Sequence, residues 1–184
     1  MSAASAIDPL RRLSRGRYRV QQFLRGFRTA VDPQDARRIV ALLSTEELQL
    51  FLRMRPRDRR HGVETLRQAE RLAAVRGIAT TEDLLVAALL HDVGKGAPHV
   101  QDRVAYVLLR ACSPRLVERL ARAEGLRWRV ALWHLAHHAE LGAGLLRAIG
   151  SAPRVIELTA VHHQPDLPAD DLELAVLLAA DEAA

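Results

Sequence analysis

The 184-residue sequence contains little cysteine, lysine or aromatic side chain, and it has no long apolar run. Its one cysteine, Cys112, excludes an internal disulfide. No apolar segment approaches the length of a membrane span, and the first residues lack the apolar core of a secretion signal. We therefore expect no membrane partner and a cytoplasmic location.

Strand signals are scarce as well. Aromatic residues make up 4% of the chain, and its valines and isoleucines do not alternate with polar residues. Hydrophobic residues reach 49%, and the abundant Ala, Leu, Arg and Glu all favour helices. The sequence predicts an all-α protein with one sizeable core. We expect a helical extension over residues 1–55, with disordered first residues, and a main domain over 56–184.

Helix ends carry local signals. Asp32 is a candidate N-cap with a proline behind it, and Ser44 forms a capping box with Glu47. Either Thr80 or Thr81 caps the run LLVAALL. Helices are predicted for the segments PQDARRIVALL, TEELQLFLRM and LLVAALL. The other predicted helices are 18–28, 57–76, 99–112, 114–124, 126–149 with a break near Gly142, 153–163 and 169–182.

The formal net charge of +5 comes from an excess of arginine. Two basic clusters, one over 11–28 and one over 53–60, raise the alternative of a nucleic-acid partner. We interpret them instead as solvated helix faces, because nucleic-acid binding would explain the charge but not the placement of the histidines described next.

Ionisable residues end an apolar run in the segment LLVAALLHDVGKG. His91 and Asp92 directly follow seven apolar residues, and such groups beside a core are costly unless something pairs with them. Lys95, in the same segment, is the only lysine of the chain. Either these side chains make local hydrogen bonds or they hold a ligand.

Further histidines stand beside apolar helix residues elsewhere in the chain. Helix bundles often build metal sites from side chains on facing helices. Imidazole nitrogens with carboxylate oxygens suit Fe, Mn, Co, Ni or Zn, and because no cysteine belongs to this set, a structural zinc–thiolate site is excluded. His91 and Asp92 diverge by about a third of a turn on a helix, so the aspartate could bridge to a second metal.

The order of these residues resembles the HD-domain superfamily of metal-dependent phosphohydrolases. HDVGK is similar to the central HDxGK motif of that family, HAELGAGLL to its next segment, and VHHQP to the paired histidines of its binuclear branch. The Gly-Tyr-Pro segment of the relatives that hydrolyse cyclic di-GMP is absent, so that substrate is not implied. The resemblance covers residues from about 60 to 184 and implies an all-α bundle of about five core helices.

The resemblance also implies a set of site residues. Lys95 would contact the phosphate and, with Asp92, would be catalytic. His163 could be a ligand, a hydrogen-bond donor to a ligand, or a phosphate contact, while His134 and His137 are expected beside the site or at the surface. The expected metal ligands are His61, His91, Asp92, His138, His162, His163 and Asp181.

From this we expect an enzyme that uses one or two divalent metal ions and metal-activated water to cleave a phosphoester of a nucleotide or another small phosphorylated metabolite. The alternative is a non-catalytic HD module that binds metal or nucleotide in signalling. A degenerate ligand set would favour that alternative, but no expected ligand position is missing.

Overall fold

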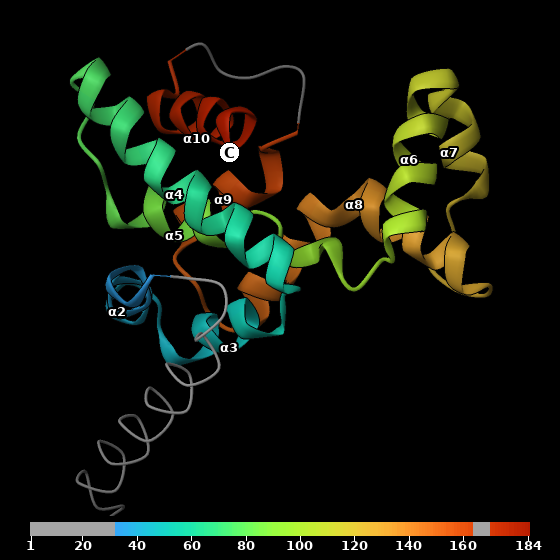
Figure 1. Ribbon diagram of the computed structural model, residues 1–184, viewed down its shortest axis with the longest axis horizontal. Helices are drawn as coiled ribbons and strands as arrows, with labels where there is room; N and C mark the ends of the chain where they lie inside the picture. The colour runs from blue at the N-terminus through green and yellow to red at the C-terminus, as the bar shows by residue number, and fades with distance from the viewer. Residues whose placement is uncertain (1–31, 164–169) are drawn as a thin grey trace, which may run out of the picture.

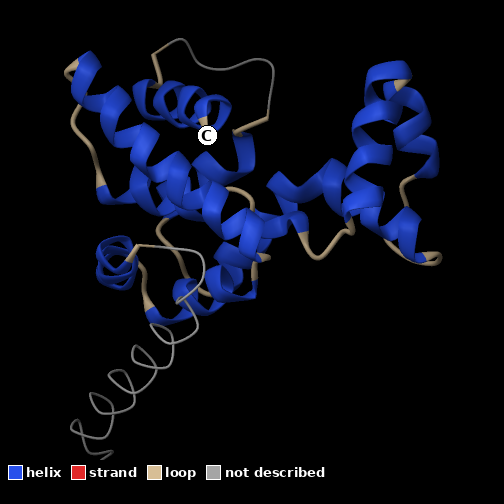
Figure 2. Ribbon diagram, in the orientation of Figure 1, coloured by secondary structure: helices blue, strands red, loops and turns tan. Residues whose placement is uncertain are grey.

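The computed structural model describes residues 32–163 and 170–184, and within these ranges all regular structure is helical and no strand occurs (Figure 1, Figure 2). This confirms the predicted all-α class. The predicted helix 18–28 and the expected disordered start lie outside the described residues. The helices are α2 (Pro33–Leu42), α3 (Thr45–Arg53), α4 (Pro56–Arg76), α5 (Glu82–Leu90), the short 3₁₀ helix η1 (Val93–Lys95), α6 (Val100–Cys112), α7 (Pro114–Leu120), α8 (Arg127–Ala148), α9 (Pro153–Val161) and α10 (Leu172–Ala183).

Most helix starts follow the local signals of the sequence. The Asp32 side chain accepts a backbone hydrogen bond at the start of α2, and the capping box of Ser44 and Glu47 opens α3 with both hydrogen bonds formed. Thr81, and not Thr80, caps α5. Gly77 ends α4 in the left-handed conformation, with φ of 66°.

Helix α7 ends at Leu120, earlier than the predicted 124. Arg129 on the next helix explains the difference. Its guanidinium donates hydrogen bonds to the carbonyls of Leu120, at 2.8 Å, and Arg119, at 3.3 Å. These carbonyls at the end of the helix are therefore satisfied from outside, and the chain turns away.

The predicted break in α8 near Gly142 is wrong, because the helix is kinked at His137 instead (φ −117°, ψ 17°). The His137 ring nitrogen Nδ1 lies 3.0 Å from the carbonyl oxygen of Trp133, one turn earlier. A side chain that inserts into the hydrogen-bond ladder is a known cause of kinks. Gly142 stays helical and serves packing, as described below.

Helix α5 is the centre of the core. Its residues from Leu84 to Leu90 are all buried, and a helix that is apolar on every side must be surrounded by other elements. It contacts α2, α3, α4, α9 and α10. Because the polar segment after Leu90 continues directly from this helix, His91 and Asp92 are placed at the middle of the molecule.

Around this core the other helices lie in two groups. Helices α2, α3, α4, α9 and α10 pack around α5, and α8 packs on α9. Helices α6, α7 and the first part of α8 form an arm at the right of Figure 1. Element η1 packs closely against α8 and links the arm to the core. Within 32–163 and 170–184, no helix is long and apolar enough to cross a membrane.

Candidate metal centre

Five helices bring the predicted ligands to one place. His61 lies in α4, His138 in α8 and Asp181 in α10. The other four follow helix ends directly: His91 and Asp92 after α5, and His162 and His163 after α9. The structure therefore brings together all seven residues of the predicted ligand set.

One cluster of donor atoms joins α4, α5 and α10. The Nε2 atom of His61 lies 2.8 Å from Asp181 Oδ1 and 3.7 Å from Asp92 Oδ2. His91 Nε2 lies 3.2 Å from Asp181 Oδ1 and 3.6 Å from Asp92 Oδ1. The ligand atoms of His61, His91 and Asp92 all lie within 4.8 Å of one another, which is compact enough for one ion. We call these three residues, together with Asp181, cluster A.

A second cluster consists of His138, His162 and His163, whose ligand atoms also lie within 4.8 Å of one another. The Nε2 atoms of His138 and His163 are 3.0 Å apart. His138 and His162 are buried, whereas His163 is exposed. We call this group cluster B.

Three buried imidazoles are held in one orientation. The Nδ1 atoms of His91, His138 and His162 lie 3.0, 2.9 and 2.7 Å from the backbone carbonyl oxygen three residues earlier. Nδ1 therefore donates to the backbone, and Nε2 of each ring faces the centre, where it presents a lone pair in the neutral rings of His138 and His162. Such an outer hydrogen bond commonly fixes the tautomer of a metal-binding histidine.

Several polar atoms of the centre are buried without a hydrogen-bond partner. They are His91 Nε2, His162 Nε2 and Asp92 Oδ1. His91 Nε2 lies near Asp181 but makes no hydrogen bond of acceptable geometry. Buried polar atoms almost always have partners, so these orphaned nitrogen and oxygen atoms, which lie at one centre, fit a bound cation.

The protonation states also suit metal ligands. Burial lowers the pKa of His138 to about 4 and that of His162 to about 3. Burial likewise lowers the pKa of the His163 imidazole. These rings are neutral at pH 7, and only a neutral imidazole can donate its lone pair.

In cluster A, attraction between charges outweighs burial. Burial raises the pKa of the Asp92 carboxyl, but His91, Lys95 and His138 lower it more, and the net pKa is well below its usual range. The pKa of Asp181 is lowered in the same way by His61 and His91. Burial lowers the His91 pKa, but Asp92 and Asp181 raise it overall. Both carboxylates are therefore ionised.

Glycines allow the helices that carry these ligands to approach. A Cβ atom on Gly94 would stand 2.0 Å from the carbonyl oxygen of His138, and one on Gly62 would stand 2.7 Å from that of Leu89. A Cβ on Gly142 would stand 3.2 Å from Thr159. Each glycine is close in sequence to a predicted ligand, so backbone contact sets the distances between the clusters.

The remaining histidines lie outside both clusters. His137 stacks on Trp133 with ring centroids 5.0 Å apart, and His134 Nδ1 lies 3.4 Å from the Gly94 carbonyl oxygen. His99 is exposed. The kink at His137 thus separates its ring from that of His138, which is consistent with the prediction of His138 as the ligand.

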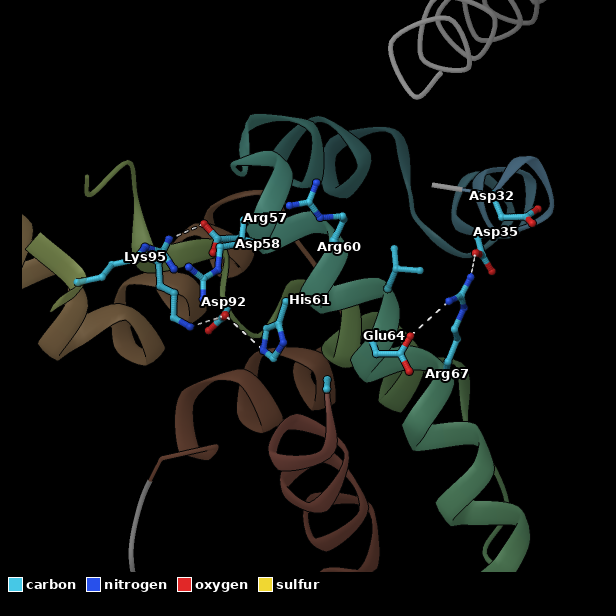
Figure 3. A pocket seen from close by; sticks show the side chains of 13 residues that line it. Asp32, Asp35, Arg57, Asp58, Arg60, His61, Glu64, Arg67, Asp92 and Lys95 are labelled. Atoms are coloured by element: carbon cyan, nitrogen blue, oxygen red, sulfur yellow. Dashed lines mark hydrogen bonds and ion pairs between the residues drawn. The ribbon is translucent and has the colours of Figure 1, made fainter. Parts of the chain in front are cut away.

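Lys95 lies at the edge of the centre, where its ammonium group contacts Asp92 Oδ2 (Figure 3). It lines a pocket of about 570 Å³ with His61, Asp92 and several charged residues, which we call the polar pocket. Arg57 and Arg60, near the start of α4, also line it, and neither forms an ion pair or hydrogen bond with residues 32–163 or 170–184. Unpaired cations beside a metal centre suit an anionic ligand.

These arginines were not among the predicted site residues, because the run RPRDRRH is also typical of a solvated helix face. The spacing within this run is the feature that could have indicated them. Arg57 precedes His61 by four residues, which places the two side chains on the same side of a helix.

The model of the HD domain family matches residues 59–183, more than half of the chain. The chain therefore belongs to the HD domain family, whose members are generally metal-dependent hydrolases. No curated protein and no solved structure matches it. The division into residues 1–55 and 56–184 stays a prediction.

Proposed function

We propose that the chain is a cytoplasmic, metal-dependent phosphohydrolase that cleaves a phosphoester of a nucleotide or another small phosphorylated metabolite. One observation carries the proposal. Two clusters of metal-binding side chains, with orphaned buried acceptors, lie against a lysine and a pocket with unpaired arginines.

The donor set fits two divalent ions. Cluster A offers two imidazoles and two carboxylates, and cluster B offers three imidazoles. Nitrogen and oxygen donors without sulfur suit Fe, Mn, Co, Ni or Zn. When bound, such ions would polarise a phosphoryl oxygen and lower the pKa of a water molecule.

The chain's own cations would bind the substrate phosphate. Lys95 has a compact charge at the edge of the centre, and its side chain is 22% exposed, which leaves the ammonium accessible from the polar pocket. Arg57 lies at the same pocket and could form two parallel hydrogen bonds to a phosphate. Asp92 would hold the ions in place and orient Lys95.

The test combines metal content with phosphate release. Elemental analysis of protein purified without a histidine tag should find one or two transition-metal ions per chain, and a panel of phosphoesters should release inorganic phosphate. Both should be lost in Asp92→Asn. Asp102→Asn is the control, because Asp102 is another carboxylate with little exposed surface, and it pairs with Arg127 and belongs to neither cluster.

The proposal would be wrong if the folded parent stayed free of metal after incubation with Mn, Fe, Co, Ni and Zn. It would also be wrong if Asp92→Asn kept the metal and the turnover of the parent. Equal loss in Asp102→Asn would attribute the effect to folding.

A further inference from the structure

A second hollow, of about 500 Å³, lies along α6 beside the metal centre. Its walls are mostly apolar and come from α6 and α8. The apolar side chains that line it are Val100, Val104, Val107, Leu108 and Leu135. We call this hollow the apolar groove.

The apolar wall on α6 is exposed to solvent. Its four valine and leucine side chains are between 52% and 66% exposed. They recur at spacings of four, three and one residues, which places them along one face of the helix. Single exposed apolar residues are ordinary, but a contiguous apolar face usually marks a binding site.

The groove is continuous with the metal centre. His138 and His163 of cluster B line it, and so does Lys95. Arg57 and Lys95 line the apolar groove and also the polar pocket, which is shown in Figure 3. A phosphate held by Lys95 at the centre would therefore leave its organic group at the mouth of the groove.

The polar side chains of the groove do not suit a nucleobase. Among the described residues that line it, there is no carboxylate, amide or aliphatic hydroxyl. The Tyr106 hydroxyl accepts a hydrogen bond from Arg110 at 2.8 Å. Apart from this hydroxyl and the two cluster B histidines, the polar side chains of the groove only donate hydrogen bonds. The amino groups of a base would thus find few side-chain acceptors there, which is costly.

We propose that the apolar groove binds the organic group of the substrate, and that the substrate class is the phosphate monoester of an aliphatic alcohol. This rests on the proposed function of the same centre. In the reaction, an oxygen of water bonds to phosphorus, the ester P–O bond breaks, and the alkoxide oxygen takes a proton. The products are inorganic phosphate and the alcohol.

The experiment uses a series of monoalkyl phosphates from methyl to octyl and the metal-loaded protein. Each methylene covered by the groove should lower KM by about two- to fourfold, with little change in kcat. The double variant Val104→Thr/Leu108→Gln should lose this dependence on chain length. Val75→Thr/Leu145→Gln should keep it, because these two residues are exposed apolar helix residues that do not line the groove.

Calorimetric titration of the same esters measures binding without turnover. If the parent binds octyl phosphate more tightly than methyl phosphate and the groove variant does not, the groove proposal is supported, even when no ester is cleaved. Absence of cleavage would instead contradict the proposed hydrolase activity. Hydrolysis with KM independent of chain length would overturn the groove proposal alone. So would a lower KM for nucleoside monophosphates than for octyl phosphate.

A second copy of the chain is the competing occupant of the groove. Sedimentation velocity of the parent and of the groove variant decides between them. A monomeric parent is the expected result. A dimer that dissociates in Val104→Thr/Leu108→Gln would make the α6 face a subunit interface and overturn the proposal.

Discussion

The Oδ1 atom of Asp92 lies 3.5 Å from the Nε2 atom of His138, although Asp92 follows α5 and His138 lies in α8. The same oxygen lies 3.6 Å from His91 Nε2. Asp92 thereby connects cluster A to cluster B, since its other oxygen faces His61. A carboxylate between two sets of imidazoles suits a pair of ions, one at each cluster.

Loss of a cluster B ligand should remove one of two ions. In His162→Gln we expect metal affinity at cluster B to fall by more than about 100-fold, since even removal of an outer partner of a ligand commonly costs about 10–100-fold. Cluster A should keep its ion. Metal titration followed by elemental analysis measures this, with His99→Gln as the control on an exposed histidine. Full loss of metal from His162→Gln would contradict two independent clusters.

Gly94→Ala should destabilise the protein and weaken metal binding, because the new Cβ would overlap the His138 carbonyl. We expect a loss of about 2 kcal/mol or more in the free energy of unfolding. Gly144→Ala is the matched control. Nothing lies within 4 Å of a Cβ at Gly144, so alanine there should stabilise the helix by about 0.5–1 kcal/mol. Chemical denaturation measures both, and equal effects of the two variants would refute the close-approach argument.

The metal-free protein should lose stability as the pH falls from about 6.5 to about 4. The pKa values of His138 and His162 are about 4 and about 3 in the folded chain, below the value of 6.5 of a free imidazole. In this window the unfolded chain therefore binds more protons than the folded chain does, so a fall in pH favours the unfolded state. The raised pKa of His91 adds no slope here, because below 6.5 that ring is protonated in both states.

Denaturation of chelator-treated protein at several pH values tests this. In the middle of the window the free energy of unfolding should fall by about 2 kcal/mol per pH unit. His138→Gln should make the slope shallower, whereas His99→Gln should leave it unchanged. A parent whose stability is flat over the window would show that these imidazoles are not buried in neutral form.

Lys95→Arg should impair turnover although it conserves the charge. The ammonium contacts Asp92 at a partly buried position, and a planar guanidinium is larger and needs different geometry. Loss of a charged hydrogen bond to phosphate corresponds to about a 10- to 100-fold drop in kcat/KM. Steady-state kinetics on any cleaved phosphoester, with metal content measured in the same samples, checks it. Unchanged kinetics would remove Lys95 from the phosphate site.

Local features of the sequence predicted most helix boundaries. Asp32, Ser44 and Thr81 cap helices through hydrogen bonds to residues two or three positions later, so the short sequence contains both partners. Gly77 ends α4 because glycine accepts the left-handed conformation. The same short range explains two errors. The end of α7 depends on Arg129, nine residues beyond Leu120, and the kink of α8 depends on a ring that bonds its own helix.

The chemical types and the order of the seven predicted ligands follow from the sequence alone, because these imidazole and carboxylate groups stand next to apolar helix residues. Their division into clusters A and B follows only from the tertiary structure. It placed His163 beside His138, Asp92 between the clusters, and Arg57 beside Lys95. These relations join residues far apart in the chain, and they depend on backbone contacts at Gly62 and Gly94 that exist only once the helices have packed.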